Sequence, residues 1–105
     1  MIVVVGRVQA DADKRDALVR IGHAVAAASR EETGCISYRL YEDTEVENEF
    51  VFVEEWESSE ALQRHFATSH IREFMQAIPE TLVAPPDVKF HTIATTMGLS
   101  DVRTS

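Results

Sequence analysis

The stretch from Phe50 to Phe74 changes from the side-chain pattern of a strand to that of a helix within a few residues. In its first half, alternation with a period of two places four side chains on one face of a strand: Phe50, Phe52, Glu54 and Trp56. In its second half, helical spacing places three side chains on one stripe: Leu62, His65 and Phe66. We therefore expect a strand that leads into an amphipathic helix, with a histidine on the helix face that packs inward.

The periodicity of the whole chain predicts four strands and two helical regions. Strands are predicted over residues 2–9, 35–42, 49–57 and 87–95. A long helix is predicted over residues 10–32, with Gly34 ending it as a C′ residue. A second helical region is predicted over residues 59–83, with a break near Thr68. The order βαββαβ predicts an α+β ferredoxin-like fold, in which a four-stranded antiparallel sheet carries its helices on one face.

The second face of the predicted sheet carries apolar side chains that one layer of helices cannot cover. Val51 and Val53 point to this face, because they alternate with the residues that face the helices. The simplest way to bury it is to pack a second copy against it, sheet to sheet, in a two-fold dimer. We predict one domain over residues 1–95 and a tail without clear periodicity over residues 96–105.

Charge and cysteine content narrow the classes of partner. The chain carries 18 acidic and 10 basic residues, for a net charge of −8, and has no basic cluster. Nucleic acids and anionic membrane surfaces are therefore not expected as partners, since both need a basic footprint. Cys35 is the only cysteine, which excludes an intrachain disulfide and fits a reducing compartment. With no signal peptide or membrane-spanning segment in the sequence, the expected location is cytoplasmic.

Three segments of the chain together resemble the antibiotic biosynthesis monooxygenase (ABM) family. They are residues 32–38 (ETGCISY), residues 55–58 (EWES), and the pair His65 and His70 ahead of Phe74. The resemblance spans roughly residues 2–95 and implies a dimeric α/β barrel, with a pocket between the helices and the sheet of each protomer. Many members of this family oxidise phenolic polycycles, such as anthrones or quinols, with molecular oxygen and without metal, flavin or haem. An electron-rich phenolate can itself reduce oxygen. The protein therefore need only bind the substrate in a site without water, assist its deprotonation and stabilise charge.

His65 is the sharpest candidate for chemistry. A neutral imidazole facing a pocket could accept a phenol proton or orient the substrate, because its pKa lies near neutrality. The alternative is a core histidine bonded to a backbone carbonyl or to Glu54. His70 could join the site or only occupy the first turn of the second helical piece. Two histidines at i and i+5 share a helix face poorly, and we predict no metal site.

The remaining candidates are aromatic or acidic. Trp56 and Tyr38 could contact the substrate through their N–H and O–H groups or could only pack in the core. Glu54 and Glu55 point to opposite faces, and the inward one needs a partner, such as His65 or an arginine (Arg7 or Arg39). We predict His65, Trp56 and Tyr38 as catalytic residues, and four residues as substrate-binding: Phe50, Phe52, Glu54 and His70.

Together these inferences predict a cofactor-independent monooxygenase, which acts with oxygen on a phenolic, quinol-like or anthrone-like molecule. A dimer that binds a small aromatic metabolite without turnover is one alternative, and a small-molecule isomerase of the same fold is another. Haem degradation is disfavoured. The haem-degrading branch of the family has an asparagine, a second tryptophan and a histidine ligand where this chain has Gly6 or Arg7, His65 and Met75.

Overall fold

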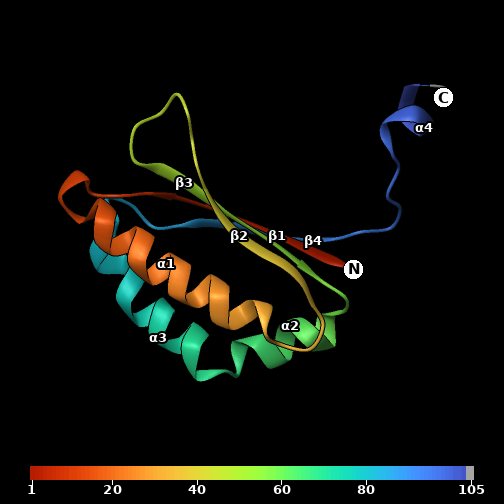
Figure 1. Cartoon of the computed structure of the whole chain (residues 1–105), viewed down its shortest axis with the longest axis horizontal. Coiled ribbons are helices and arrows are strands. Elements are labelled where there is room, and N and C mark those ends of the chain that lie inside the picture. The colour runs from red at the N-terminus through yellow and green to blue at the C-terminus, as the bar shows by residue number, and fades with distance from the viewer. Residues whose placement is uncertain (104–105) are drawn as a thin grey trace.

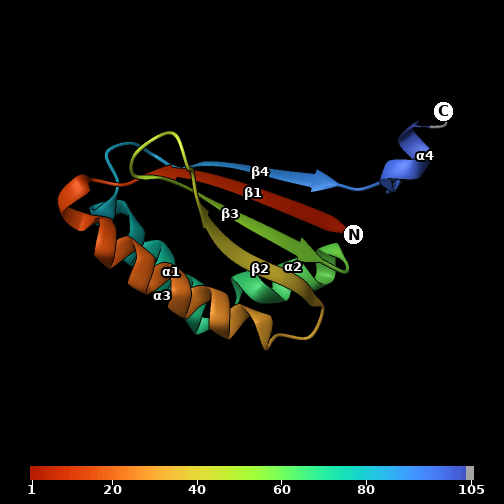
Figure 2. The same cartoon turned by 45° about the horizontal axis from the view of Figure 1, so that its top comes forward.

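The computed structural model describes residues 1–103 and confirms the α+β ferredoxin-like architecture (Figure 1). Its elements are β1 (Ile2–Gln9), η1 (Ala12–Lys14), α1 (Arg15–Arg30), β2 (Cys35–Glu42), β3 (Glu49–Trp56), α2 (Ser59–Phe66), α3 (Ser69–Ala77), η2 (Ile78–Thr81), β4 (Asp87–Thr92) and α4 (Leu99–Arg103). The four strands form one antiparallel sheet in the order β2-β3-β1-β4. Helices α1, α2 and α3 all lie on the same face of this sheet (Figure 2).

The core lies between the central strands and the helices. Val4, Gly6 and Val8 of β1 pair with Glu54, Phe52 and Phe50 of β3, and this register sets the side chains that point toward the helices. Helix α1 packs closely on the sheet at Gly22. A Cβ atom at this position would lie 2.7 Å from Leu40 Cδ2, so any larger residue would force the end of the Leu40 side chain to move.

The other face of the sheet is left open, as the alternation predicts. Its centre consists of four partly exposed side chains, Val3, Val5, Val51 and Val53. Among residues 1–103, no helix lies over this face (Figure 2). The sheet alone therefore leaves a β-branched apolar surface in contact with solvent.

The predicted long helix is shorter than expected at both ends. Asp11 caps the 3₁₀ turn η1 by accepting a hydrogen bond from the Asp13 amide, and regular α-helix runs only from Arg15 to Arg30. Gly34 is therefore not the C′ residue. It lies in the turn after the helix, where its φ of +89° and its approach to Ala61 require glycine.

The predicted break in the second helical region is confirmed. Ser58 caps α2 and Thr68 caps α3, each by accepting a hydrogen bond from a backbone N–H in the first turn. The predicted stripe of α2 is only partly buried: His65 is buried, whereas Phe66 is 41 % exposed. Ile36 is also exposed, because the pairing of β2 with β3 is irregular between Cys35 and Ser37.

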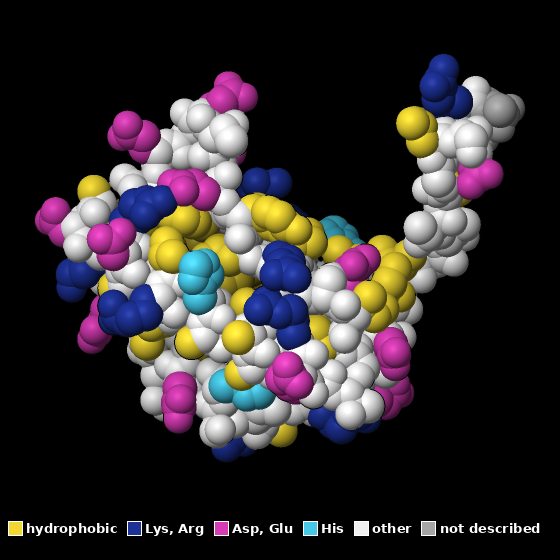
Figure 3. Space-filling view, viewed as in Figure 1, with side chains coloured by type: hydrophobic (Ala, Val, Ile, Leu, Met, Phe, Trp, Pro, Cys, Tyr) yellow, Lys and Arg dark blue, Asp and Glu magenta, His cyan; other side chains and the backbone are white. Residues whose placement is uncertain are grey.

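The C-terminal segment differs from its prediction. Strand β4 ends at Thr92, and residues 99–103 form the short helix α4, for which the sequence gives no periodic signal. This arm stands away from the body of the molecule (Figure 3). Residues 104–105 of the predicted tail lie outside the described residues, and the domain boundary after residue 95 stays a prediction. Within residues 1–103, none of the helices combines the length and the apolar character needed to cross a membrane.

Candidate active site

A cavity of about 300 Å³ lies between the sheet and helices α2 and α3. Most of its wall is apolar and includes Val8, Phe52, Ile71 and Phe74. Three polar side chains line it, Tyr38, Glu54 and His65, and the exposed side chains of Val88 and Phe90 stand at its β4 side. This volume lies at the lower end of the range for small-molecule sites, and a mostly apolar wall with a few polar groups is typical of them.

His65 projects from α2 toward the sheet and is 1 % exposed. Its ring lies 4.5 Å from that of Trp56 and 5.7 Å from that of Tyr38, measured between centroids. Burial lowers the pKa of His65, although the hydrogen bond and charge of Glu32 act against this effect. The imidazole is therefore neutral at neutral pH and can accept a proton.

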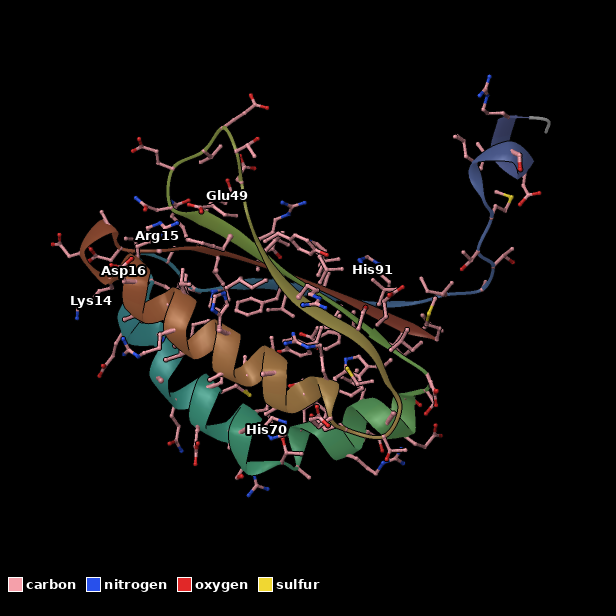
Figure 4. All side chains as sticks on the ribbon, viewed as in Figure 1. Lys14, Arg15, Asp16, Glu49, His70 and His91 are labelled. Carbon is pink, nitrogen blue, oxygen red and sulfur yellow. The ribbon has the colours of Figure 1, made fainter. Side chains whose placement is uncertain are left out.

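Glu32 joins His65 to His70. Its Oε2 atom lies 2.7 Å from His65 Nδ1 and 2.7 Å from His70 Nε2. Glu32 belongs to the turn between α1 and β2, and this turn contacts α2 because Gly34 lets it approach Ala61. His70 occupies the first turn of α3 on the side toward α1 (Figure 4). The break between α2 and α3 thus brings both histidines to one carboxylate, which their spacing along a single helix would not allow.

Glu54 is the inward carboxylate of the pair, and its partner is neither His65 nor an arginine. Trp56 Nε1 donates a hydrogen bond of 3.0 Å to Glu54 Oε1. Burial raises the pKa of Glu54 to about 7, although hydrogen bonds from Trp56 and Tyr38 act in the opposite direction. Glu55 faces away from the helices and accepts a 2.6 Å hydrogen bond from the Ser37 hydroxyl.

Tyr38 supplies a hydroxyl to the cavity that stays protonated. Burial raises its pKa above the ordinary tyrosine value, and the nearby charge of Glu54 acts in the same direction. Its ring contacts those of Phe52 and Trp56 edge to face. The side chain is therefore fixed, and its hydroxyl takes part in hydrogen bonds without losing its proton.

The structure brings four of the seven predicted site residues to the cavity wall: Tyr38, Phe52, Glu54 and His65. Three others lie elsewhere. Trp56 is fully buried behind His65 and Glu54, Phe50 packs under the guanidinium of Arg15, and His70 lies on the far side of Glu32. The roles of all seven stay predictions. Glu32 was not predicted, although it is the first residue of the ETGC segment.

Glu32, His65 and His70 are also the residues that could hold a metal ion, since their three ligand atoms lie within 4.8 Å of one another. The two N···O distances of 2.7 Å are hydrogen-bond lengths. Ligand atoms around a tetrahedral zinc ion lie roughly 3.3 Å apart, given Zn–N and Zn–O bonds of about 2 Å. The observed spacing fits shared protons better than a shared metal.

Comparisons with known proteins agree with this architecture. The family model described as "Antibiotic biosynthesis monooxygenase" matches residues 1–77. A Synechocystis protein named "Uncharacterized protein sll1783" is 38% identical over 93% of this chain and 67% of its own length. "Putative monooxygenase YcnE" of Bacillus subtilis is 33% identical over 84% of this chain and 93% of its own. The solved structure of Rv0793 from Mycobacterium tuberculosis superposes with a TM-score of 0.86 at 29% identity, over 92% of this chain and 98% of that one.

Proposed function

The chain belongs to the antibiotic biosynthesis monooxygenase family, and from this we propose that it oxidises an electron-rich phenolic, quinol or anthrone-like molecule with molecular oxygen and no cofactor. The observation that carries the proposal is a buried His65 in the wall of a mostly apolar cavity. Its Nδ1 atom is hydrogen-bonded to the Glu32 carboxylate. The Nε2 atom is therefore the one that remains to accept a substrate proton.

The reaction begins with deprotonation of the bound substrate. Its rings pack against Phe52 and Phe74, and its acidic proton passes to His65 Nε2. The Tyr38 hydroxyl lines the same wall, and it donates a hydrogen bond to the oxyanion by giving up its bond to Glu54. Because the wall is apolar, water is excluded and the anion is not stabilised by solvent. The anion is then electron-rich enough to reduce oxygen.

The overall step balances for an anthrone-like substrate without any further reductant. Two C–H bonds of the reacting CH₂ group break, and this carbon becomes a carbonyl in a four-electron oxidation. One atom of O₂ becomes the carbonyl oxygen, and the other leaves as water with the two protons. His65 takes the first proton from the substrate and returns it to the reduced oxygen.

The active form that we propose is a dimer, with two copies packed through the open face of the sheet. The support for it is the partly exposed centre of that face, Val3, Val5, Val51 and Val53, together with membership of a family whose fold implies dimeric barrels. Each copy retains its own cavity, since the cavity lies on the helical face.

Isomerisation is the second candidate, and one observation favours it. Glu54 and His65 line the same cavity, and burial raises the pKa of Glu54 to about 7 while it lowers that of His65. Two titratable groups whose environments shift their pKa values in opposite directions suit a reaction that moves a proton between two carbons. Such an enzyme would consume no oxygen.

Oxygen uptake with a panel of anthrones and hydroquinones separates these functions. Uptake above the spontaneous rate is expected for the wild type, and we expect His65→Ala to lower it at least tenfold, because the base is lost. His65→Asn, whose amide N–H stands near the position of Nδ1 and keeps a donor to Glu32, checks that the loss is chemical and not structural. His23→Ala, at an exposed position of α1, is the control. Uptake that survives in both His65 variants contradicts the role of His65, and a wild type without uptake contradicts the monooxygenase.

A further inference from the structure

We propose that Glu32, His65 and His70 form a partly buried triad, in which the Glu32 carboxylate fixes His65 as the Nδ1–H tautomer and stabilises its imidazolium, while His70 holds that carboxylate from the solvent side. The inference rests on the proposed function for its catalytic consequence. It assigns Glu32 and His70 as positioning residues, since neither lines the cavity.

The hydrogen bonds fix the tautomer. An ionised carboxylate has only acceptor atoms, so a nitrogen 2.7 Å from Glu32 Oε2 must carry a proton. His65 therefore has its hydrogen on Nδ1, and the neutral ring carries its lone pair on Nε2. This is the tautomer that a base facing the cavity requires, because the opposite tautomer would present an N–H donor to the substrate.

The charge of Glu32 matters once His65 has taken a proton. An imidazolium at a position 1 % exposed has lost nearly all of its hydration, and such a charge is unfavourable unless an opposite charge lies close to it. The Glu32 carboxylate lies 2.7 Å from His65 Nδ1, and the Glu32 side chain is itself only 13 % exposed. The imidazolium that stores the substrate's proton is therefore formed inside an ion pair.

His70 completes the arrangement from the other side. Among residues 1–103, the two histidines are the only hydrogen-bond partners of the Glu32 side chain. His70 is 26 % exposed and lines a separate groove of about 200 Å³ between α1 and α3, with Ile21 and Glu73. The triad thus spans from the wall of the cavity to a groove at the surface. Without His70, the Glu32 side chain would be free to turn toward this groove and away from His65.

The first test uses no substrate. In ¹H–¹⁵N spectra of histidine-labelled protein, His65 of the wild type is expected as the Nδ1–H tautomer. Glu32→Ala should abolish this preference, and Glu32→Gln should lower the midpoint of the His65 titration by removing the negative charge. Glu31→Gln, at the neighbouring exposed position, should do neither. An unchanged His65 spectrum and titration in both Glu32 variants would overturn the triad.

The second test measures turnover. Glu32→Gln should lower kcat for oxygen uptake at least tenfold and leave KM within about threefold, because the charge acts on the protonated state and not on substrate binding. His70→Ala should lower kcat about threefold or more, and His70→Gln, which restores an N–H donor, should recover most of it. If the wild type is active and all three variants match it, the triad is wrong and the monooxygenase stands. If the wild type is inactive, the spectra still decide the triad.

A metal at these residues is the alternative outcome. Metal analysis of the purified protein should find no zinc or iron in stoichiometric amount. A metal present at one equivalent, absent from Glu32→Gln and needed for turnover would replace the triad by a metal centre.

Discussion

Glu54 is the carboxylate whose ionisation its surroundings clearly oppose. It is 8 % exposed, and burial raises its pKa from 4.5 to about 7. As the pH rises through this interval, the unfolded chain releases the Glu54 proton while the folded protein keeps it. By linkage, folding stability falls as the pH rises wherever the folded state binds more protons. Ionisation of Glu54 thus destabilises the fold as the pH rises to neutrality and above.

Glu54→Gln should remove this dependence. Relative to the wild type, the variant should gain about 3 kcal/mol of stability between about pH 5 and pH 8, since each pKa unit corresponds to about 1.4 kcal/mol. His65 acts in the opposite direction, because burial lowers its pKa and stability then falls as the pH drops below about 6.5. Only the difference between variant and wild type isolates Glu54. Urea unfolding across the pH range measures it, with Glu55→Gln as the control on the opposite face. Parallel curves for wild type and Glu54→Gln would show that Glu54 is not the source.

At the scale of elements, the break between α2 and α3 decides whether the triad can form. Thr68 acts on both helices. Its hydroxyl oxygen accepts a hydrogen bond from the Ile71 amide at the start of α3, and its O–H donates a 2.7 Å hydrogen bond to the His65 carbonyl at the end of α2. It therefore fixes the direction in which α3 leaves α2, and with it the position of His70 relative to His65.

Thr68→Ala and Ser58→Ala form a matched pair, because each removes one N-cap. Both should lose about 1 kcal/mol of unfolding free energy, the usual effect of such a deletion. Only Thr68→Ala should also lower oxygen uptake, by severalfold, since Ser58 caps the outer end of α2 and holds neither histidine. Chemical unfolding and oxygen electrode traces on the two variants provide the comparison. Equal rates in both would mean that the angle between the helices does not control the site.

Local periodicity in the sequence is sufficient to predict the bounds of strands whose side chains alternate regularly. Residues 2–9 and 35–42 were predicted with the bounds that the structure has, because alternation needs only a few neighbouring residues. The position of Glu32 could not be predicted in this way. It lies in a turn without periodicity, and its partners are more than 30 residues away in the sequence. The same limit applies to His70. A spacing of five residues separates two histidines on the surface of one helix, but in the structure His65 and His70 belong to two different helices.

At the scale of the whole molecule, the open face of the sheet decides whether the protein is a monomer or a dimer. Val5 and Val53 pair across β1 and β3 at its centre. Leaving apolar surface of this kind in contact with water, rather than burying it, is unfavourable by roughly 25 cal/mol per Å². Charged side chains such as Arg7 and Arg39 lie on the same face around this centre. An apolar centre with a charged surround is the usual anatomy of a protein interface.

Val53→Asp should therefore convert the protein from dimer to monomer. The substitution places a carboxylate at the centre of the proposed interface, where two-fold symmetry brings in a second one, and burying such unpaired charges costs several kcal/mol. Sedimentation velocity at micromolar concentration measures the change. Val83→Asp makes the same chemical change at an exposed position after η2, and this control should remain dimeric. If the wild type sediments as a monomer, the face is open in solution. If both variants stay dimeric, the two copies associate through another surface, and the valine face of the sheet is not the interface.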